Sequence, residues 1–170
     1  YQMMQAVAEI AEGQLEGLVI QSSSMTESQK EEFLAQFVDE PGSSRIGFCV
    51  MGGIFSEGID LRNDRLIGAV IVGTGLPMVC NERELFRGYY DEKCNAGFEY
   101  AYLYPGINKV LQSGGRVIRT KDDKGAILLL DDRFTKQQYY NLFPREWFPN
   151  VTVNFQGMRK VLEEFWQGKN

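Results

Sequence analysis

The sequence contains no histidine, so several kinds of catalysis are closed to it. Serine–histidine and cysteine–histidine nucleophilic mechanisms cannot operate within this chain, and neither can general-base catalysis by histidine. Cysteine is scarce too: Cys49, Cys80 and Cys94 are widely spaced and form no Cys-x-x-Cys pair. Because this spacing argues against a disulfide framework or a zinc site, we expect buried thiols. Any chemistry must use carboxylates, arginines and the backbone.

Long apolar runs are also absent. No stretch approaches the roughly 20 apolar residues that span a bilayer, and no basic segment followed by an apolar one opens the chain. We therefore expect a soluble, cytoplasmic protein without a membrane partner. The 170 residues, of which 44% are hydrophobic, suffice for one domain with a sizeable core.

Basic side chains are scarce in only one part of the chain. Residues 1–40 hold eight acidic side chains and one basic side chain, whereas residues 41–170 hold 17 basic and 15 acidic ones. The net charge of −5 is not typical of a nucleic-acid binder, but the uneven distribution leaves room for basic stripes in the second part. Charge alone therefore does not decide whether nucleic acid is a partner.

Apolar spacing and glycine or proline breakers predict alternating helices and strands. Thr26 with Gln29 forms a capping box, and Asn81 is a candidate cap for another helix. The expected helices cover residues 1–12, 26–40, 81–93, 106–119, 135–142 and 154–167, and the expected strands cover residues 18–21, 45–50, 66–72 and 126–130. Such alternation predicts an α/β fold, in which helices cover both faces of a mostly parallel sheet and ligands bind at the carboxyl ends of the strands.

Segment 112–119 reads Gln-Ser-Gly-Gly-Arg-Val-Ile-Arg and carries two arginines three residues apart. If this segment is helical, Arg116 and Arg119 share a helix face and can direct two guanidinium groups at one anion. Arginine suits that task because it stays charged and binds phosphate oxygens in a bidentate manner. The alternative for two arginines alone is a solvated basic helix face.

A second motif precedes the first. Segment 52–60 reads Gly-Gly-Ile-Phe-Ser-Glu-Gly-Ile-Asp, and an apolar strand then ends in the turn Gly73-Thr74-Gly75-Leu76-Pro77. Glu57 and Asp60 alone are also compatible with paired carboxylates for acid–base or magnesium chemistry. The turn is equally compatible with a phosphate contact or with a simple connection between a strand and a helix.

Together these motifs resemble motifs V and VI of superfamily 2 helicases, in the local form of the XPD/DinG branch. The resemblance covers residues 45–134 with specific motifs, including the Asp-Lys-Gly at 123–125 and the Asp-Asp-Arg at 131–133. It implies a RecA-like, three-layer α/β/α fold and the second of two motor domains over residues 1–170, excised from a longer helicase. Tyr1 would then be the last residue of a preceding strand.

The resemblance also implies a role for each motif residue. Neither a Gly-x-x-x-x-Gly-Lys-Ser/Thr loop nor an Asp-Glu-x-His sequence is present, so ATP and Mg²⁺ would be bound mainly by an upstream RecA-like domain of the same polypeptide. The catalytic residues of this chain would be Gln112, Arg116 and Arg119. Glu57, Gly58, Asp60 and Gly115 would lie on the nucleotide side, and Ser56, Gly73, Thr74 and Gly75 would contact single-stranded DNA. We expect no metal site in this chain, whereas an iron–sulfur cluster could lie upstream.

The function that follows is the C-terminal domain of a DinG-type, ATP-dependent DNA helicase that moves on single-stranded DNA. Its polarity, 5′ to 3′, and its context, DNA repair or replication, are implied only by the family, and we expect a monomer. The alternative is a non-catalytic RecA-like module that binds single-stranded nucleic acid or a protein partner. A base-stacking role for Tyr89, Tyr90, Tyr100, Tyr102 and Tyr104 is less expected than a place in the core.

Overall fold

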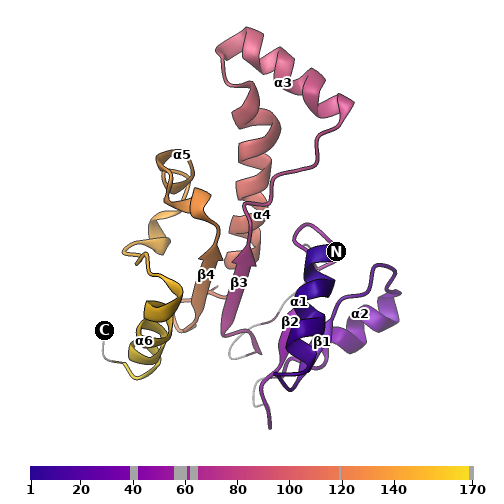
Figure 1. Ribbon diagram of the computed structural model, residues 1–170, viewed down its shortest axis with the longest axis vertical. Coiled ribbons are helices and arrows are strands. Elements are labelled where there is room, and N and C mark those ends of the chain that lie inside the picture. The colour runs from indigo at the N-terminus through magenta and orange to yellow at the C-terminus, as the bar shows by residue number, and fades with distance from the viewer. Residues whose placement is uncertain (39–41, 56–60, 62–64, 119, 169–170) are drawn as a thin grey trace.

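The computed structural model describes residues 1–38, 42–55, 61, 65–118 and 120–168. Within these residues the chain alternates helices with four short strands (Figure 1). Strands β1 (Leu18–Ile20) and β2 (Ile46–Phe48) pair in parallel, and so do β3 (Gly68–Val72) and β4 (Ala126–Leu130). The predicted α/β class with parallel strands is therefore confirmed.

The four strands form two separate pairs among the described residues rather than one continuous sheet. Residue Leu18 lies opposite Ile46 in the first pair, and Gly68 lies opposite Ala126 in the second. The sequence could not predict this division, because hydrophobic patterning locates strands without specifying which strands are neighbours. Consequently β2 and β3 each keep one edge that is not bonded to another described strand.

The first pair is covered by the two N-terminal helices, α1 (Gln2–Glu12) and α2 (Glu27–Leu34). The predicted capping box at the start of α2 is present: the Thr26 side chain accepts a hydrogen bond from Gln29 N, and the Gln29 side chain accepts one from Thr26 N. A cluster of buried apolar side chains fills the space between α2 and the strands, namely Val19, Phe33, Phe37, Phe55 and Leu61. Phe55 stacks on Phe33 with ring centroids 4.4 Å apart, which ties the chain after β2 to α2.

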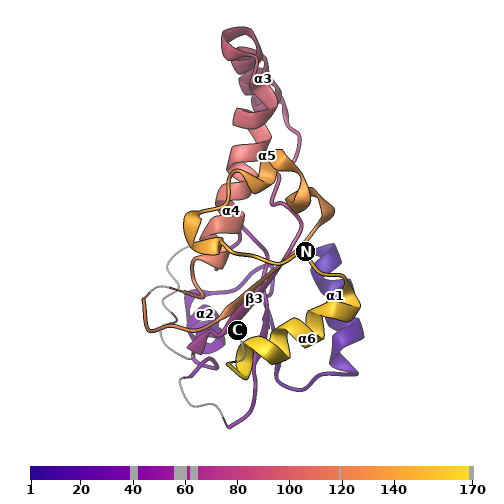
Figure 2. The ribbon, with the colours of Figure 1, turned by 90° about the vertical axis from the view of Figure 1, so that its left-hand side faces the viewer.

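After β3 the chain leaves the core and forms an arm (Figures 1 and 2). Helix α3 (Asn81–Cys94) lies at its tip, and a π-helical turn, η2 (Glu99–Leu103), leads into α4 (Tyr104–Gly114), which returns to the core. The N-cap of α3 is Cys80, so the expectation that Asn81 is the cap was wrong by one residue. The helix ends at Asn95, whose left-handed conformation (φ 54°) stops the helical hydrogen bonding.

A second cluster of buried side chains lies between α4, β3 and the chain after β4. Its members are Ile71, Leu103, Ile107, Val110, Phe134 and Tyr139. The single helix predicted for residues 135–142 is instead a 3-10 turn, η3 (Asp132–Thr135), followed by the short α5 (Gln137–Tyr140) and a second 3-10 turn, η4 (Arg145–Trp147). The predicted last helix is confirmed as α6 (Phe155–Trp166), although none of its residues is fully buried.

Two expectations about burial were wrong. All three cysteines have exposed surface, because they lie at the ends of β2 and α3 rather than inside the two clusters, although burial of the Cys49 thiol raises its pKa to about 11. Tyr89, Tyr100 and Tyr104 are exposed along the arm, and only Tyr102 of the five tyrosines is buried. The arm lacks a covering layer among the described residues, so its aromatic rings pack on one another, as Tyr90 does on Tyr100 at 4.2 Å between ring centroids.

Candidate functional site

Helix α4 runs antiparallel to β3, and this direction decides where the predicted site residues lie. Near its start, Gly106 packs against the turn that follows β3: a Cβ added there would lie 2.7 Å from Thr74 O. At its end, Gly114 packs against Ile127, the second residue of β4, and against Trp147. The helix therefore connects the carboxyl end of β3 to the amino end of β4, over about 12 Å at 1.5 Å per residue.

The helix ends earlier than the sequence indicated. We expected it to continue to residue 119, but α4 stops at Gly114 and Gly115 is its C-cap. Gly115 N donates to Leu111 O at 2.8 Å, and Val117 N then donates to Gly114 O at 3.1 Å, which is the tighter pattern of a turn. Two consecutive glycines have low helix propensity, so the chain leaves the helix there. Arg116 is accordingly in a turn and not on the face of α4.

The residues of the arginine motif lie beside the amino ends of β3 and β4. Val117 is buried and packs against Gly125, the residue just before β4, while Gly125 also lies close to Ile67 O, just before β3. Gln112 is exposed on the last turn of α4, and Arg116 is half-buried. Arg119 lies outside the described residues. The described part of the arginine motif therefore does not lie at the carboxyl ends of these strands, where ligands of α/β sheets commonly bind.

The loop after β2 is fixed by a buried glutamine. Gln21, at the end of β1, is 2% exposed; its Oε1 accepts from Val50 N at 2.8 Å and its Nε2 donates to the Tyr1 hydroxyl at 2.7 Å. Gly53 N donates to Val50 O at 2.9 Å, which closes a turn at the loop's start. These bonds hold the chain that leads into segment 56–60. The predicted residues Ser56, Glu57, Gly58 and Asp60 themselves lie outside the described residues.

The same loop touches α4 through Gly52. This glycine has φ +77°, and a Cβ added to it would lie 3.3 Å from both Cδ and Cε of Lys109. A side chain at position 52 would therefore be strained by the backbone and crowded by the lysine. Lys109 lies one turn of α4 before Gln112 and makes no ion pair with a described acidic side chain.

The turn after β3 is tightly packed on α4. Gly73 (φ +82°) donates to Leu130 O at 3.2 Å, and Gly75 (φ +67°) approaches Gly106 so closely that an added Cβ would lie 2.7 Å from Gly106 O. Thr74 between them is 1% exposed, and its Oγ1 has no hydrogen-bond partner among the described residues. Leaving such a hydroxyl unpaired costs about 1–3 kcal/mol. In this conformation the hydroxyl does not reach the surface.

Asp123, before β4, and Asp131, after β4, are each held by hydrogen bonds from residues nearby in the sequence. Asp123 Oδ2 accepts from Thr120 N at 2.8 Å in the turn before β4. After β4, Asp131 accepts from Arg133 N, Nε and Nη2 at 2.7 to 2.9 Å, and these bonds to the guanidinium and the backbone lower the pKa of Asp131. The described residues contain no group of three or more histidine, cysteine, aspartate or glutamate side chains arranged to hold a metal ion.

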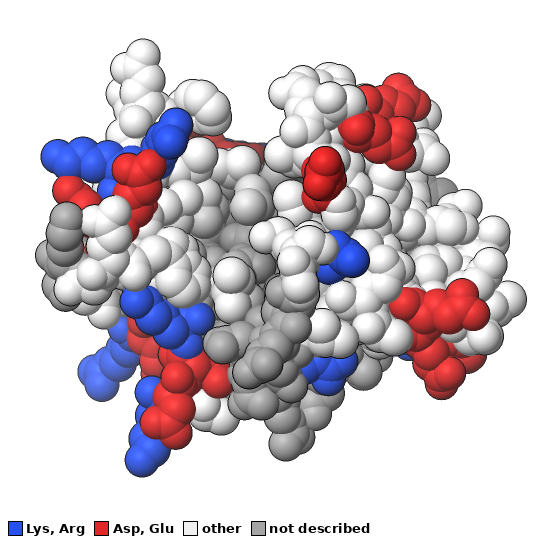
Figure 3. All heavy atoms as spheres, turned by 90° about the horizontal axis from the view of Figure 1, so that it is seen from below, with Lys and Arg blue, Asp and Glu red and all other residues white. Residues whose placement is uncertain are grey.

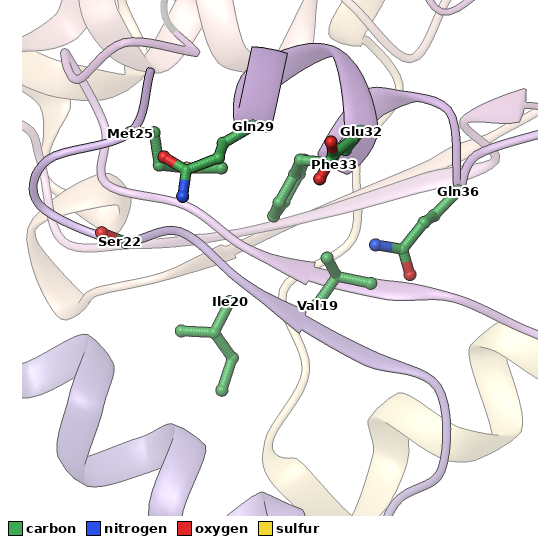
Figure 4. Close-up of a pocket in the computed structure, with 8 residues that line it drawn as sticks. All are labelled: Val19, Ile20, Ser22, Met25, Gln29, Glu32, Phe33 and Gln36. Atoms are coloured by element: carbon green, nitrogen blue, oxygen red, sulfur yellow. The ribbon is translucent and has the colours of Figure 1, made fainter. Parts of the chain in front are cut away.

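A shallow pocket lies elsewhere, between β1 and α2 (Figure 4). Its floor is apolar, with Val19 and Phe33, and the amides of Gln29 and Gln36 lie at its rim. None of the predicted site residues that the structure describes lines it. One of its two amides, that of Gln29, is already engaged in the capping box of α2.

Charge is distributed unevenly over the face seen from below, where the amino ends of β3 and β4 lie (Figure 3). The side formed by α1 and α2 shows mostly acidic side chains, as the sequence predicts for residues 1–40, whereas the side of α6 mixes both signs.

None of the described helices is long and apolar enough to cross a membrane.

Three residues that contribute to this arrangement were missed by the sequence analysis: Gln21, Gly106 and Lys109. Gln21 carried one usable signal, since a glutamine directly after an apolar strand lies where parallel strands end. Gly106 and Lys109 carried none, because their importance comes from contacts with Thr74 and Gly52, which are distant in the sequence.

Comparison with known proteins places these motifs in a family. A model of the helicase C-terminal domain family matches residues 1–150. The chain is 36% identical over 121 residues to the regulator of telomere elongation helicase 1 homolog of Oryza sativa subsp. japonica, covering 64% of this chain and 12% of that protein. It is 34% identical over 88 residues to the ATP-dependent DNA helicase DinG of Photobacterium profundum, covering 51% of this chain and 13% of that protein.

Further matches agree with these. The chain is 32% identical over 150 residues to the ATP-dependent DNA helicase chl1 of Schizosaccharomyces pombe, covering 81% of this chain and 17% of that protein. It thus spans less than a fifth of the length of these relatives. A solved structure titled XPD_APO superposes with a TM-score of 0.65 at 22% identity, covering 83% of this chain and 28% of that one, which shows the RecA-like fold. The chain belongs to the helicase C-terminal domain family, and within it to the XPD/DinG type.

Proposed function

We propose that this chain is the C-terminal motor domain of an ATP-dependent DNA helicase, which couples ATP hydrolysis to movement along single-stranded DNA. The observation that carries the proposal is the placement of two motifs at opposite ends of α4. The glycine turns at Gly52 and at Gly73 to Gly75 pack on its first half, and Gln112 and Arg116 lie at its end. One rigid element thus links two candidate binding edges.

The end of α4 with Gln112 and Arg116 is called the arginine edge below. It is proposed to act on ATP that is held mainly by an upstream RecA-like domain. Arg116 and Arg119 would neutralise the charge that builds up on the γ-phosphate, Gln112 would donate a hydrogen bond near it, and Gly115 permits close approach. A turn suits this task, because Arg116 is then not confined to one helix face. An arginine in this position is typically worth about 10³–10⁵ in rate. Mg²⁺ would be bound by the upstream domain together with the nucleotide.

The glycine edge, which consists of the turns at Gly52 and at Gly73 to Gly75, is proposed to contact the DNA backbone. Gly73, Thr74 and Gly75 form one turn there, and segment 56–60 with Ser56 and Gly58 follows the other. A loop lined by glycines offers backbone amides, which bind phosphates without reading bases, so we expect weak sequence preference. Asp60, with Glu57, is proposed to face the nucleotide. Because Thr74 Oγ1 is enclosed, its direct contact with a phosphate requires the turn to shift.

Part of the proposal is that an upstream segment of the same polypeptide adds strands to the two strand pairs. The edges of β2 and β3 that are unpaired among the described residues can each accept a further parallel strand. The Tyr1 hydroxyl bonds to Gln21, which also binds Val50 beyond β2, so Tyr1 lies at the carboxyl edge of this strand pair.

The finer features are proposed from the family alone. They are 5′-to-3′ polarity, a role in DNA repair or replication, a monomeric state and a cytoplasmic location. An iron–sulfur cluster, if the full polypeptide has one, is proposed to lie upstream, because the three cysteines here lie on separate elements.

The arginine role is tested by Arg119→Ala in the full polypeptide. We expect ATP turnover to fall by about 10³-fold or more, with only a modest loss of ATP affinity, because the arginine acts on charge that develops in the transition state. Arg159→Ala is the matched control, since this arginine on α6 is exposed and pairs with Glu163. Turnover equal in the two variants would contradict the role assigned to Arg119.

A further inference from the structure

The turn after β3 and the start of α4 are interlocked backbone against backbone. A Cβ on Gly106 would lie 2.7 Å from Thr74 O and 3.1 Å from Leu76 N, and a Cβ on Gly75 would lie 2.7 Å from Gly106 O. Neither glycine therefore has room for a side chain, because main-chain atoms of the facing segment already occupy that space. Because main-chain atoms and not flexible side-chain ends form this contact, the turn cannot move without displacing α4 or separating from it.

In this conformation of the turn, the Thr74 hydroxyl lacks a hydrogen bond among the described residues. This hydroxyl is enclosed at 1% exposure, although Thr74 lies between two glycines with φ +82° and φ +67°. Glycines at both sides allow the turn to change its path at small conformational cost. Any rearrangement that gives the hydroxyl a partner is favoured by the hydrogen bond it gains. The turn thus has a physical reason to adopt a second position.

Helix α4 can carry such a displacement to its other end. Between Gly106 and Gly114 it is a continuous α-helix whose inner face, with Ile107 and Val110, is fully packed in the core. Close-packed elements of this kind shift as rigid bodies and do not absorb small movements. Gln112 lies in the last turn of the helix, and Arg116 follows two residues after its end.

We propose that Gly106 and Thr74 are positioning residues that couple strand binding to ATP turnover. When a phosphate of single-stranded DNA binds at the Gly73–Gly75 turn, the turn shifts, Thr74 Oγ1 gains a partner, and the contact at Gly106 moves α4 together with Gln112 and Arg116. This inference rests on the proposed function and adds the contact through which its two edges communicate.

The test compares Gly106→Ala with Gly88→Ala in the full polypeptide. A methyl group at position 106 meets backbone atoms, whereas an added Cβ at Gly88, on α3, meets nothing within 4 Å. We expect Gly106→Ala to lose at least about fivefold of its stimulation by single-stranded DNA, measured as the ratio of ATP turnover with DNA to ATP turnover without DNA, the lower end of typical coupling between sites. Gly88→Ala should keep both. Equal stimulation in the two variants would overturn the proposal.

A second pair of variants covers the case in which Gly106→Ala does not fold. Thr74→Val keeps the shape of the side chain and removes the unpaired hydroxyl, so it should raise the melting temperature while weakening the response to single-stranded DNA. Thr135→Val is the control, because that hydroxyl is exposed and already donates to Asp132 O. A stabilised Thr74→Val protein with a wild-type response to DNA would show that Thr74 is merely structural. Wild-type protein without any DNA stimulation would instead refute the proposed function itself.

Discussion

At the scale of single residues, the most consequential polar side chain is one that no motif contains. Gln21 is buried, and its amide joins three parts of the chain: the end of β1, the backbone at Val50 and the Tyr1 hydroxyl. The loop after β2 therefore starts from a fixed point, although segment 56–60 beyond it carries the predicted contacts. A buried amide with both ends satisfied specifies one geometry, because any shift leaves a donor or acceptor unpaired.

We predict that Gln21→Leu destabilises the domain by about 1–3 kcal/mol, because the Val50 N–H loses its partner in a partly buried position. Chemical denaturation followed by circular dichroism measures this difference. Gln14→Leu is the matched control, since Gln14 is exposed just after α1. Equal midpoints for the two variants would show that water replaces the lost bonds at Gln21.

Some features of single residues were predictable from the sequence, and others were not. The capping box of Thr26 and Gln29 was predictable because both partners lie within one helical turn. The position of Arg116 was not: the arginine spacing favoured a helix, and the glycine pair before it ended the helix first. The exposure of Cys80 was also missed, because burial depends on which elements cover a position and not on the residue type.

At the scale of elements, α4 and α6 differ in how they are held. Helix α4 contributes Ile107 and Val110 to the core, whereas α6 has no fully buried residue and its Phe155 is 85% exposed. Its apolar residues Val161, Leu162 and Phe165 are only half-buried, and Trp166 is exposed. The Lys124 ammonium lies 5.0 Å from the Phe165 ring centroid and 5.3 Å from that of Trp166, so it attaches the end of α6 to the turn before β4.

We predict that Lys124→Ala loosens α6 while leaving global stability nearly unchanged. A partly exposed cation–π contact is worth about 0.5–1 kcal/mol, which corresponds to roughly two- to fivefold faster amide exchange in a locally opening helix. Hydrogen exchange measured by mass spectrometry resolves α6 peptides. Lys121→Ala, in the same turn but without a ring contact, is the control. Unchanged exchange in α6 after Lys124→Ala would refute the attachment.

Strand positions were predictable to within a few residues because buried parallel strands are short apolar runs between glycines. Their pairing was not predictable from the same pattern, and the direction of α4 along β3 was not either. That direction places the glycine turns at one end of α4 and Gln112 and Arg116 at the other, a separation on which the sequence pattern is silent. The family resemblance was sufficient to identify the motifs, but only contacts such as Gly106 with Thr74 locate them relative to each other.

At the scale of the whole molecule, the chain corresponds to a small part of the length of its relatives. Its relatives are five or more times longer than the matched part, and this chain contains no phosphate-binding loop of its own. In the proposed function the chain contributes two edges and a connection: the glycine turns bind the DNA strand, the arginines act on the nucleotide, and α4 lies between them. All three are needed together only in the full polypeptide.

The proposed motor function can be tested by measuring ATP turnover of the full polypeptide with and without single-stranded DNA, for the wild type and for the double variant Arg116→Ala/Arg119→Ala. We expect strong stimulation by DNA in the wild type and a loss of about 10³-fold or more in the variant. A well-folded wild type whose turnover does not respond to DNA would rule out the motor function and favour a non-catalytic binding module.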